Sequence, residues 1–211
     1  MRKYIFDIDG TILEENYSKE VEFFKEILSK EEAERFIPKI GKYIQGYEDE
    51  YSKYSVNGLS NYLTKVSGIN ITPEIIYDWR EVVSNYDSKV VYGAEDFLYY
   101  IWGHKNAYIV GLSNWFGDDQ IRRLEKAGLL KYFDNIYGGD FYIKPSMGSY
   151  NNAAGKSNNS DCIVIGDSLE NDVYGPYRAG MDAYYFDRGK EKFNKKLVKS
   201  FTNYTDLMRR F

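Results

Sequence analysis

The sequence predicts an α/β fold in which helices cover both faces of a parallel sheet and a small helical cap is inserted after the first strand. Three observations support this prediction. Short apolar runs rich in β-branched and aromatic residues recur along the chain, as buried strands require. Segments with helical periodicity alternate with these runs, which favours a parallel sheet between two helical layers. Residues 14–89 carry mostly helical patterns, so they are expected to form the insertion.

Five segments are expected to form the strands of the sheet. The first is bounded by turn chemistry, because Asp7 and Asp9 follow it and Gly10 comes directly afterwards. In an open α/β sheet, ligands bind at the carboxyl edge of the strands, so polar residues at strand ends are candidate site residues. The predicted strands are Tyr4–Phe6, Ala107–Leu112, Phe133–Tyr137, Ile163–Ile165 and Ala183–Phe186.

Helices are expected between the later strands. Gly128 gives the second of them a C-terminal stop, and Pro145 suits the first turn of the third, which is weakly patterned. The predicted helices are Ala94–Trp102, Asp118–Ala127, Pro145–Gly155 and Asn171–Ala179.

The insertion contains three further helical signals. Ser29 and Glu32 form a capping box that opens a helix, and Val56–Val66 is a weaker helical segment. Thr72 is an N-cap followed by Pro73 at the first helical position. Two apolar stripes indicate the buried faces: Tyr17, Val21, Phe24 and Leu28 on the first helix, and Ile75, Trp79, Val82 and Tyr86 on the last.

Composition restricts the class of protein. The 211 residues, 43% hydrophobic and 28% charged, describe an ordinary globule large enough for one α/β domain with an insert. The net charge of −4 gives no reason to expect nucleic acid or an anionic membrane as a partner. No apolar run approaches the ~20 residues that cross a bilayer, and the start is too short for a signal-peptide core. A cytoplasmic protein, monomeric or weakly dimeric, is therefore expected.

Three other features are interpreted as structural. The single cysteine, Cys162, lies in a predicted strand and is expected to pack in the core. The only histidine, His104, is expected at a helix end or on the surface, so acid–base chemistry would have to come from carboxylates. The locally basic segment from Arg188 to Arg210 is interpreted as a solvated face.

Four segments place chemically useful side chains at predicted strand ends or helix starts. Each has an ordinary alternative, since Asp, Ser and Asn also cap turns and helices and Lys before Pro is also typical of a surface. Two carboxylates crowded at a strand tip nevertheless favour a cation or a water-filled cleft over a packed core. The segments are Asp7-Ile8-Asp9-Gly10-Thr11, Ser113-Asn114, Lys144-Pro145, and Gly166-Asp167 with Asp172.

In this order and spacing, the four segments resemble motifs I to IV of the haloacid dehalogenase superfamily. The resemblance covers roughly residues 1–13 and 90–190. It implies a Rossmann-like catalytic core formed by residues 1–13 and 90–211. It also implies that residues 14–89 form a helical cap of the C1 type, whose contacts select the substrate.

The resemblance further implies a role for each matched residue. Asp7 would be the nucleophile, and Asp9 the general acid that protonates the leaving alcohol and later activates water. Mg²⁺ would be held by Asp7, Asp167 and the backbone carbonyl of Asp9. The remaining implied roles are phosphate binding by Ser113 and the backbone N–H of Asn114, charge neutralisation by Lys144, and support of Lys144 or of a metal-bound water by Asp172.

The leading function is thus a Mg²⁺-dependent phosphatase that hydrolyses a small phosphorylated metabolite through an aspartyl-phosphate. A phosphosugar mutase is the first alternative, disfavoured because the cap contains no histidine. A haloacid dehalogenase is the second, and Asp9 counts against it because that reaction keeps the nucleophile but needs neither a second acid nor a metal. A catalytically idle binding fold is the third, disfavoured because all four costly motifs are present.

Overall fold

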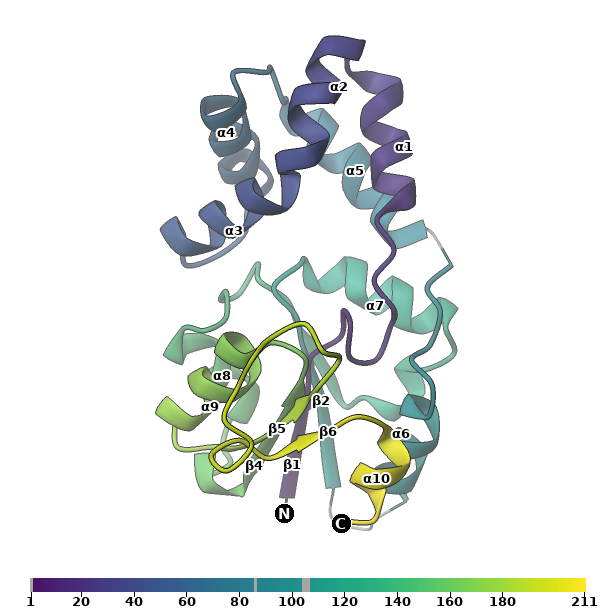
Figure 1. Ribbon diagram of the computed structural model, residues 1–211, viewed down its shortest axis with the longest axis vertical. Helices are drawn as coiled ribbons and strands as arrows, with labels where there is room; N and C mark the ends of the chain where they lie inside the picture. Colours follow the sequence, from purple (N-terminus) through teal and green to yellow (C-terminus); the bar gives the residue numbers. More distant parts are fainter. Residues whose placement is uncertain (1, 86, 104–106) are drawn as a thin grey trace.

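The computed structural model describes residues 2–85, 87–103 and 107–211 and contains a six-stranded parallel sheet (Figure 1). The strand order is β3-β2-β1-β4-β5-β6, so β1 lies inside the sheet and pairs with β2 on one side and with β4 on the other. The predicted α/β class is confirmed. The strands are β1 (Arg2–Phe6), β2 (Ala107–Leu112), β3 (Asn135–Tyr137), β4 (Cys162–Gly166), β5 (Asp182–Phe186) and β6 (Ser200–Phe201).

Helices cover both faces of this sheet because alternate side chains of each strand point to opposite sides. Tyr4 and Phe6 belong to a core shared with α6 and α10, whereas Ile5 belongs to a second core shared with α8 and Cys162. Figure 1 shows α8 and α9 on one side of the sheet and α6 and α10 on the other. The helices of this part are α6 (Ala94–Trp102), α7 (Gly117–Lys126), α8 (Met147–Ala154), α9 (Gly175–Arg178) and α10 (Tyr204–Met208).

The insertion folds into helices that stand over the carboxyl edge of the sheet (Figure 1). They bury a separate apolar cluster that includes Phe24, Phe36, Leu63 and Trp79, so most of their packing energy comes from each other. The two segments that connect the insertion to the core lie side by side, since the Glu14 N–H donates to the Lys89 carbonyl at 2.7 Å. The helices are α1 (Ser18–Ile27), α2 (Lys30–Phe36), α3 (Ile40–Glu50), α4 (Val56–Ser67) and α5 (Pro73–Asn85).

Several local expectations are confirmed. Ser29 and Glu32 form the capping box of α2, with the Ser29 hydroxyl accepting from the Glu32 N–H at 3.3 Å. Phe24 and Leu28 of the first stripe are buried, and Cys162 is buried in β4. None of the helices in the described ranges is both long and apolar enough to cross a membrane.

Other expectations need correction. Tyr17 of the first stripe lies before α1 and is exposed. On α5, Trp79 of the predicted stripe is buried, but Ile76 and Val83 are buried in place of Ile75 and Val82, because the helix packs on α1, α4 and α7 at once. The helix predicted at residues 171–179 is a π-helical turn, Glu170–Tyr174, followed by α9. Tyr86 and His104 lie outside the described residues.

Candidate active site

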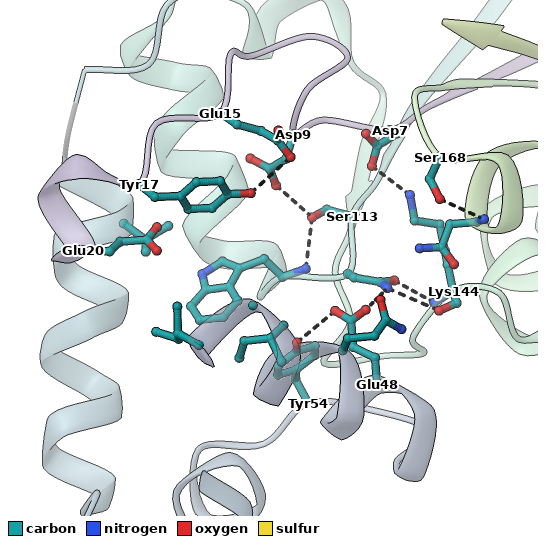
Figure 2. Close-up of a pocket in the computed structure, with 18 of the residues that line it drawn as sticks. Asp7, Asp9, Glu15, Tyr17, Glu20, Glu48, Tyr54, Ser113, Lys144 and Ser168 are labelled. Carbon is teal, nitrogen blue, oxygen red and sulfur yellow. Dashed lines mark hydrogen bonds and ion pairs between the residues drawn. The ribbon is translucent and has the colours of Figure 1, made fainter. Parts of the chain in front are cut away.

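The candidate site residues meet at a cavity between the insertion and the strand tips, with a volume of about 560 Å³ (Figure 2). All seven residues singled out from the sequence line it. They come from the ends of β1, β2 and β4 and from the segments before α8 and after β4, as the rule for the carboxyl edge of a parallel sheet requires. The residues are Asp7, Asp9, Ser113, Asn114, Lys144, Asp167 and Asp172.

Asp7 is fixed at the tip of the central strand. Its N–H donates to the Ile165 carbonyl at 2.9 Å, which continues the pairing of β1 with β4 beyond the last strand residue. The Thr11 hydroxyl donates to Asp7 Oδ2 at 3.0 Å. Gly10 turns the chain here with a positive φ of 76°, and a Cβ at this position would collide with the Asp167 carboxylate. A side chain at residue 10 would therefore push two candidate metal ligands apart.

Lys144 joins two of the buried carboxylates. Its ammonium donates to Asp7 Oδ1 and to Asp172 Oδ1, each at 2.8 Å, and all three residues are buried. Burial by itself would lower the pKa of Lys144, but the carboxylates of Asp172 and Asp7 outweigh it and raise that pKa above its usual value. The lysine is therefore a fixed positive charge at the strand tips.

Asp172 is held by its own turn. Its second oxygen, Oδ2, accepts the Ser168 N–H at 3.1 Å, and the carboxylate fills the space where a Cβ of Gly166 would lie. Both oxygens of Asp172 thus have protein partners, one of them Lys144. This contact is one of the two roles expected for Asp172, the orientation of Lys144.

The strand tips carry more negative than positive charge. Burial raises the pKa of Asp7 well above its usual range against the attraction of Lys144, and the neighbouring Asp172 and Asp167 raise it further. Burial also raises the pKa of Asp167, although Lys190 donates a hydrogen bond to it. These directions mean that the carboxylates lack counter-charge in the protein alone.

The donor set suits a hard divalent cation. Asp7, Asp167 and Asp172 each offer a carboxylate oxygen, and the three oxygens lie within 4.8 Å of one another. Mg²⁺ prefers a site that has few carboxylates and leaves room for water and phosphate. The side chain of Asp9 is not part of this group, and its backbone carbonyl remains a predicted ligand.

Asp9 is held apart from that cluster by helix α7. Its Oδ2 accepts from Gln120 Nε2 at 2.5 Å, and its Oδ1 forms an ion pair with Arg123. The Ser113 hydroxyl donates to Asp9 Oδ2 at 3.5 Å and accepts from Gln120 Nε2 at 2.9 Å. The two aspartates of motif I therefore line one cavity but have separate partners, as Figure 2 shows for Asp7 with Lys144 and Asp9 with Ser113.

Asn114 connects the core with the insertion through its side chain. Its Oδ1 accepts the Lys144 N–H at 2.7 Å, and its Nδ2 donates to the Lys144 carbonyl at 3.2 Å. The same Nδ2 donates to Glu48 Oε2 of α3 at 3.0 Å. These bonds fix the segment that carries Lys144, while the phosphate contact expected from the Asn114 backbone remains a prediction.

Sequence reasoning missed four residues at the site. Gln120 and Arg123 lie one turn apart on the buried face of α7, which also holds Asp119, so the polar sequence of this helix gave no signal that this face is buried. Lys190 donates to Asp167 Oδ2 and Glu15 Oε2, each at 2.8 Å, and Arg188 donates to the Gly10 carbonyl at 2.8 Å. The interpretation of residues 188–210 as a solvated face is thus wrong at its start, because this loop folds back over the strand tips.

Comparison with protein families supports the resemblance seen in the sequence. The model of the family described as haloacid dehalogenase-like hydrolase matches residues 4–186. This match spans both the sheet and the insertion. No curated protein matches the chain by sequence.

Solved structures share the fold over nearly the whole chain. The HAD-hydrolase YfnB from Bacillus subtilis, bound to magnesium, is 21% identical with a TM-score of 0.75 over 99% of this chain and 97% of that one. A HAD phosphatase from Thermococcus onnurineus is 23% identical with a TM-score of 0.66 over 100% and 97%. The L-2-haloacid dehalogenase from Xanthobacter autotrophicus is 16% identical with a TM-score of 0.68 over 99% and 97%. At these identities the likeness establishes the fold, and the reaction has to be argued from the site.

Proposed function

Because the chain belongs to the haloacid dehalogenase-like hydrolases, we propose that it is a Mg²⁺-dependent phosphatase that hydrolyses a small phosphorylated metabolite. One observation carries the proposal: Asp9 lines the cavity in addition to the cluster of Asp7, Asp167 and Asp172. Transfer of a phosphoryl group requires a nucleophile, a proton donor for the leaving alcohol and positive charge for the phosphate. A dehalogenase keeps the nucleophile but needs neither a metal nor an acid at position 9.

The proposed reaction proceeds in two steps. A carboxylate oxygen of Asp7 attacks phosphorus, the bond between phosphorus and the ester oxygen breaks, and Asp9 gives its proton to the leaving alcohol. Water then attacks the aspartyl-phosphate while Asp9 takes its proton, which releases phosphate and restores Asp7. Thr11 and Lys144 hold the two oxygens of Asp7, and Gln120 and Arg123 hold Asp9 on the cavity wall.

Positive charge is needed because phosphate and carboxylate repel one another. Two unit charges 4 Å apart interact by ~4 kcal/mol at an effective dielectric constant of 20. Lys144 supplies one cation at the strand tips. Bound Mg²⁺, held by Asp7, Asp167 and the backbone carbonyl of Asp9 with Asp172 in support, would supply the rest of the counter-charge beside the phosphoryl oxygens.

The similar structures are consistent with this proposal at the level of the fold. They include a magnesium-bound hydrolase and a phosphatase as well as haloacid dehalogenases. Against the mutase alternative, the described part of the insertion contributes no Lys, Arg or His to the cavity that could bind a second phosphate.

A direct assay separates the candidates. The purified protein is incubated with p-nitrophenyl phosphate, glucose 1-phosphate or 2-chloropropionate, with Mg²⁺ or with EDTA, and phosphate, glucose 6-phosphate and chloride are measured. We expect Mg²⁺-dependent phosphate release, lost in Asp9→Asn for substrates with a poor leaving group. Chloride release without Mg²⁺ would establish the dehalogenase instead, and glucose 6-phosphate would establish the mutase.

A further inference from the structure

The part of the cavity distant from the strand tips has a distinct chemical character. Its walls come mostly from the insertion, with Trp115 from the core, and are largely apolar and aromatic. Trp79 lies against Trp115 with ring centroids 4.9 Å apart, and Tyr54 lies 5.7 Å from Trp115. A phosphate bound at Asp7 would direct the rest of its substrate toward this wall, which is formed by residues including Val21, Ile40, Ile44, Tyr54, Trp79 and Trp115.

Two carboxylates interrupt this apolar wall, one from each side. Glu20 of α1 and Glu48 of α3 line the cavity, and both are half-buried (Figure 2). The cations that line the same cavity within the described chain are Arg123 and Lys144. Arg123 forms its ion pair with Asp9, and Lys144 forms its ion pairs with Asp7 and Asp172. The positive charge of the cavity is therefore concentrated at the strand tips and the negative charge extends into the cap.

Glu48 is positioned entirely by neutral donors. Its Oε1 accepts from the Tyr54 hydroxyl at 2.9 Å and its Oε2 accepts from Asn114 Nδ2 at 3.0 Å. Burial raises the pKa of Glu48 above its usual value despite these two bonds. Lys144 attracts the Glu48 carboxylate but forms no ion pair with it.

Glu20 is in a similar electrostatic position. Burial and, to a smaller extent, the neighbouring Asp9 raise the pKa of Glu20 to about 7, and Arg123 and Trp79 oppose the shift only in part. Neither Glu20 nor Glu48 forms a salt bridge with a described residue, and burying a carboxylate that lacks an ion pair is costly. A ligand that brings positive charge to this region would recover that cost.

We propose that the substrate is a phosphate monoester of an alcohol that carries a protonated amine or a quaternary ammonium group on a short apolar or aromatic skeleton. This inference rests on the proposed phosphatase function and deepens it. The phosphate would lie at Lys144, while the ammonium group would lie between Glu20 and Glu48 beside the aromatic wall. Aromatic faces attract cations, and carboxylates accept their hydrogen bonds. A leaving group with its own carboxylate or second phosphate would meet like charge instead.

A matched series of aryl phosphates tests the proposal on the wild-type protein with saturating Mg²⁺. The three substrates are phenyl phosphates with a para 2-aminoethyl, propyl or 2-carboxyethyl group, so the reacting phosphate is the same and the substrates differ at the end of the para group. We expect kcat/KM to be about tenfold higher for the amine than for the neutral compound, and lowest for the carboxylate. Equal values for the three substrates, or a preference for the neutral or acidic one, would overturn the inference.

Isosteric variants identify the residues responsible. In Glu20→Gln and Glu48→Gln, the ratio of kcat/KM for the amine to that for the carboxylate should fall about tenfold each, and in the double variant further. Glu34→Gln is the control, because Glu34 is an exposed residue of α2 in the same cap and its loss changes the net charge equally. A ratio that falls as much in Glu34→Gln as in the other two would show a long-range effect and contradict the assignment.

A binding measurement separates failure of this inference from failure of the phosphatase proposal. Calorimetric titration with the phosphate-free phenols, tyramine and 3-(4-hydroxyphenyl)propionate, needs no turnover. Tyramine should bind more tightly in wild type and lose that advantage in the Glu20→Gln/Glu48→Gln variant. Selective tyramine binding without phosphate release would leave the cation site standing and refute the phosphatase. Phosphate release without any preference for the amine would do the reverse.

Discussion

The ion pair between Arg80 and Asp119 allows a quantitative test of how the insertion is fastened to the core. Arg80 of α5 contacts Asp119 of α7 through both arms of its guanidinium, with Nε–Oδ2 at 2.9 Å and Nη2–Oδ1 at 3.0 Å. The Asp119 side chain is 1% exposed and that of Arg80 is 16% exposed. Arg80 also stacks on the ring of Phe116 at 4.0 Å. Replacing Arg80 by Met keeps the apolar stem and leaves the carboxylate buried without a cation.

The expected cost is large for a single substitution. Removing one partner of a buried ion pair costs about 3–5 kcal/mol, mostly because the other charge stays buried. Of this, about 1 kcal/mol is the lost contact of the guanidinium with the Phe116 ring. The first turn of α7, where Asp119 lies, offsets a small part, since a helix N-terminus favours negative charge.

The same two helices provide the control. Arg122 of α7 and Glu81 of α5 form a second ion pair at 2.6 Å, but their side chains are 45% and 56% exposed. Glu81→Gln should therefore cost much less than Arg80→Met, because water screens an exposed ion pair. The free energy of unfolding is measured by urea titration in Mg²⁺-free buffer at pH 7, followed by circular dichroism and by tryptophan fluorescence.

A double-mutant cycle with Asp119→Asn completes the test. If the cost of Arg80→Met comes from the buried, unpaired charge of Asp119, the Arg80→Met/Asp119→Asn variant should lose clearly less free energy of unfolding than the sum of the two single losses. The reasoning is refuted if Arg80→Met and Glu81→Gln cost the same, or if the two losses at Arg80 and Asp119 simply add.

Four further outcomes are expected. Asp7→Asn should abolish turnover while the fold is kept, because only a carboxylate forms the acyl-phosphate; a retained rate above a few percent of wild type would exclude Asp7 as nucleophile. Turnover should vanish after dialysis against EDTA, return with Mg²⁺, and be strongly reduced in Asp167→Ala, so activity that survives metal removal would exclude the metal. Replacing residues 14–89 by a short linker should leave some turnover of a small aryl phosphate in a folded core and erase discrimination among metabolites; a truncation that keeps the full-length preference would place specificity elsewhere. Glu20→Gln should change stability with pH: with its folded pKa raised from 4.5 to about 7, wild type keeps its full stability below pH 4.5 and loses part of it as pH rises through 7. Melting temperatures at pH 5 and pH 8 should thus differ more between variant and wild type at pH 8, and an equal difference at both would contradict the shifted pKa.

Strand ends alone place part of the candidate site that the sequence predicts. Asp7 follows β1 and Asp167 follows β4, and neighbouring parallel strands bring their carboxyl ends to one edge whatever the helices do. A short buried strand and the polar residue after it are local signals, so one sequence suffices to place both carboxylates. The same reasoning extends to Ser113 at the end of β2.

The residues that sequence reasoning missed depend on how separate elements dock. Arg123 and Gln120 reach Asp9 only because α7 docks between α5 and β3, and Lys190 reaches Asp167 only because the loop after β5 folds back. Helix α3 was missed for a related reason. Its Gly46 weakens local helical propensity, yet the absent side chain makes room for the hydroxyl of Tyr62 on α4. In each case the reason for the residue lies in a distant segment of the chain.

The separation of charges across the cavity gives the core and the insertion different tasks. The two cations that line it within the described residues form ion pairs with core aspartates, so under the proposed function they would face the phosphate, while the cap carboxylates feel their attraction without an ion pair. Asn114 joins the two regions, since one amide group contacts both Glu48 and the backbone of Lys144. A substrate that pulls Glu48 toward its ammonium group would therefore act on the segment that carries Lys144. By this connection, occupancy of the cap by the correct leaving group can be linked to the position of the lysine that serves the phosphate.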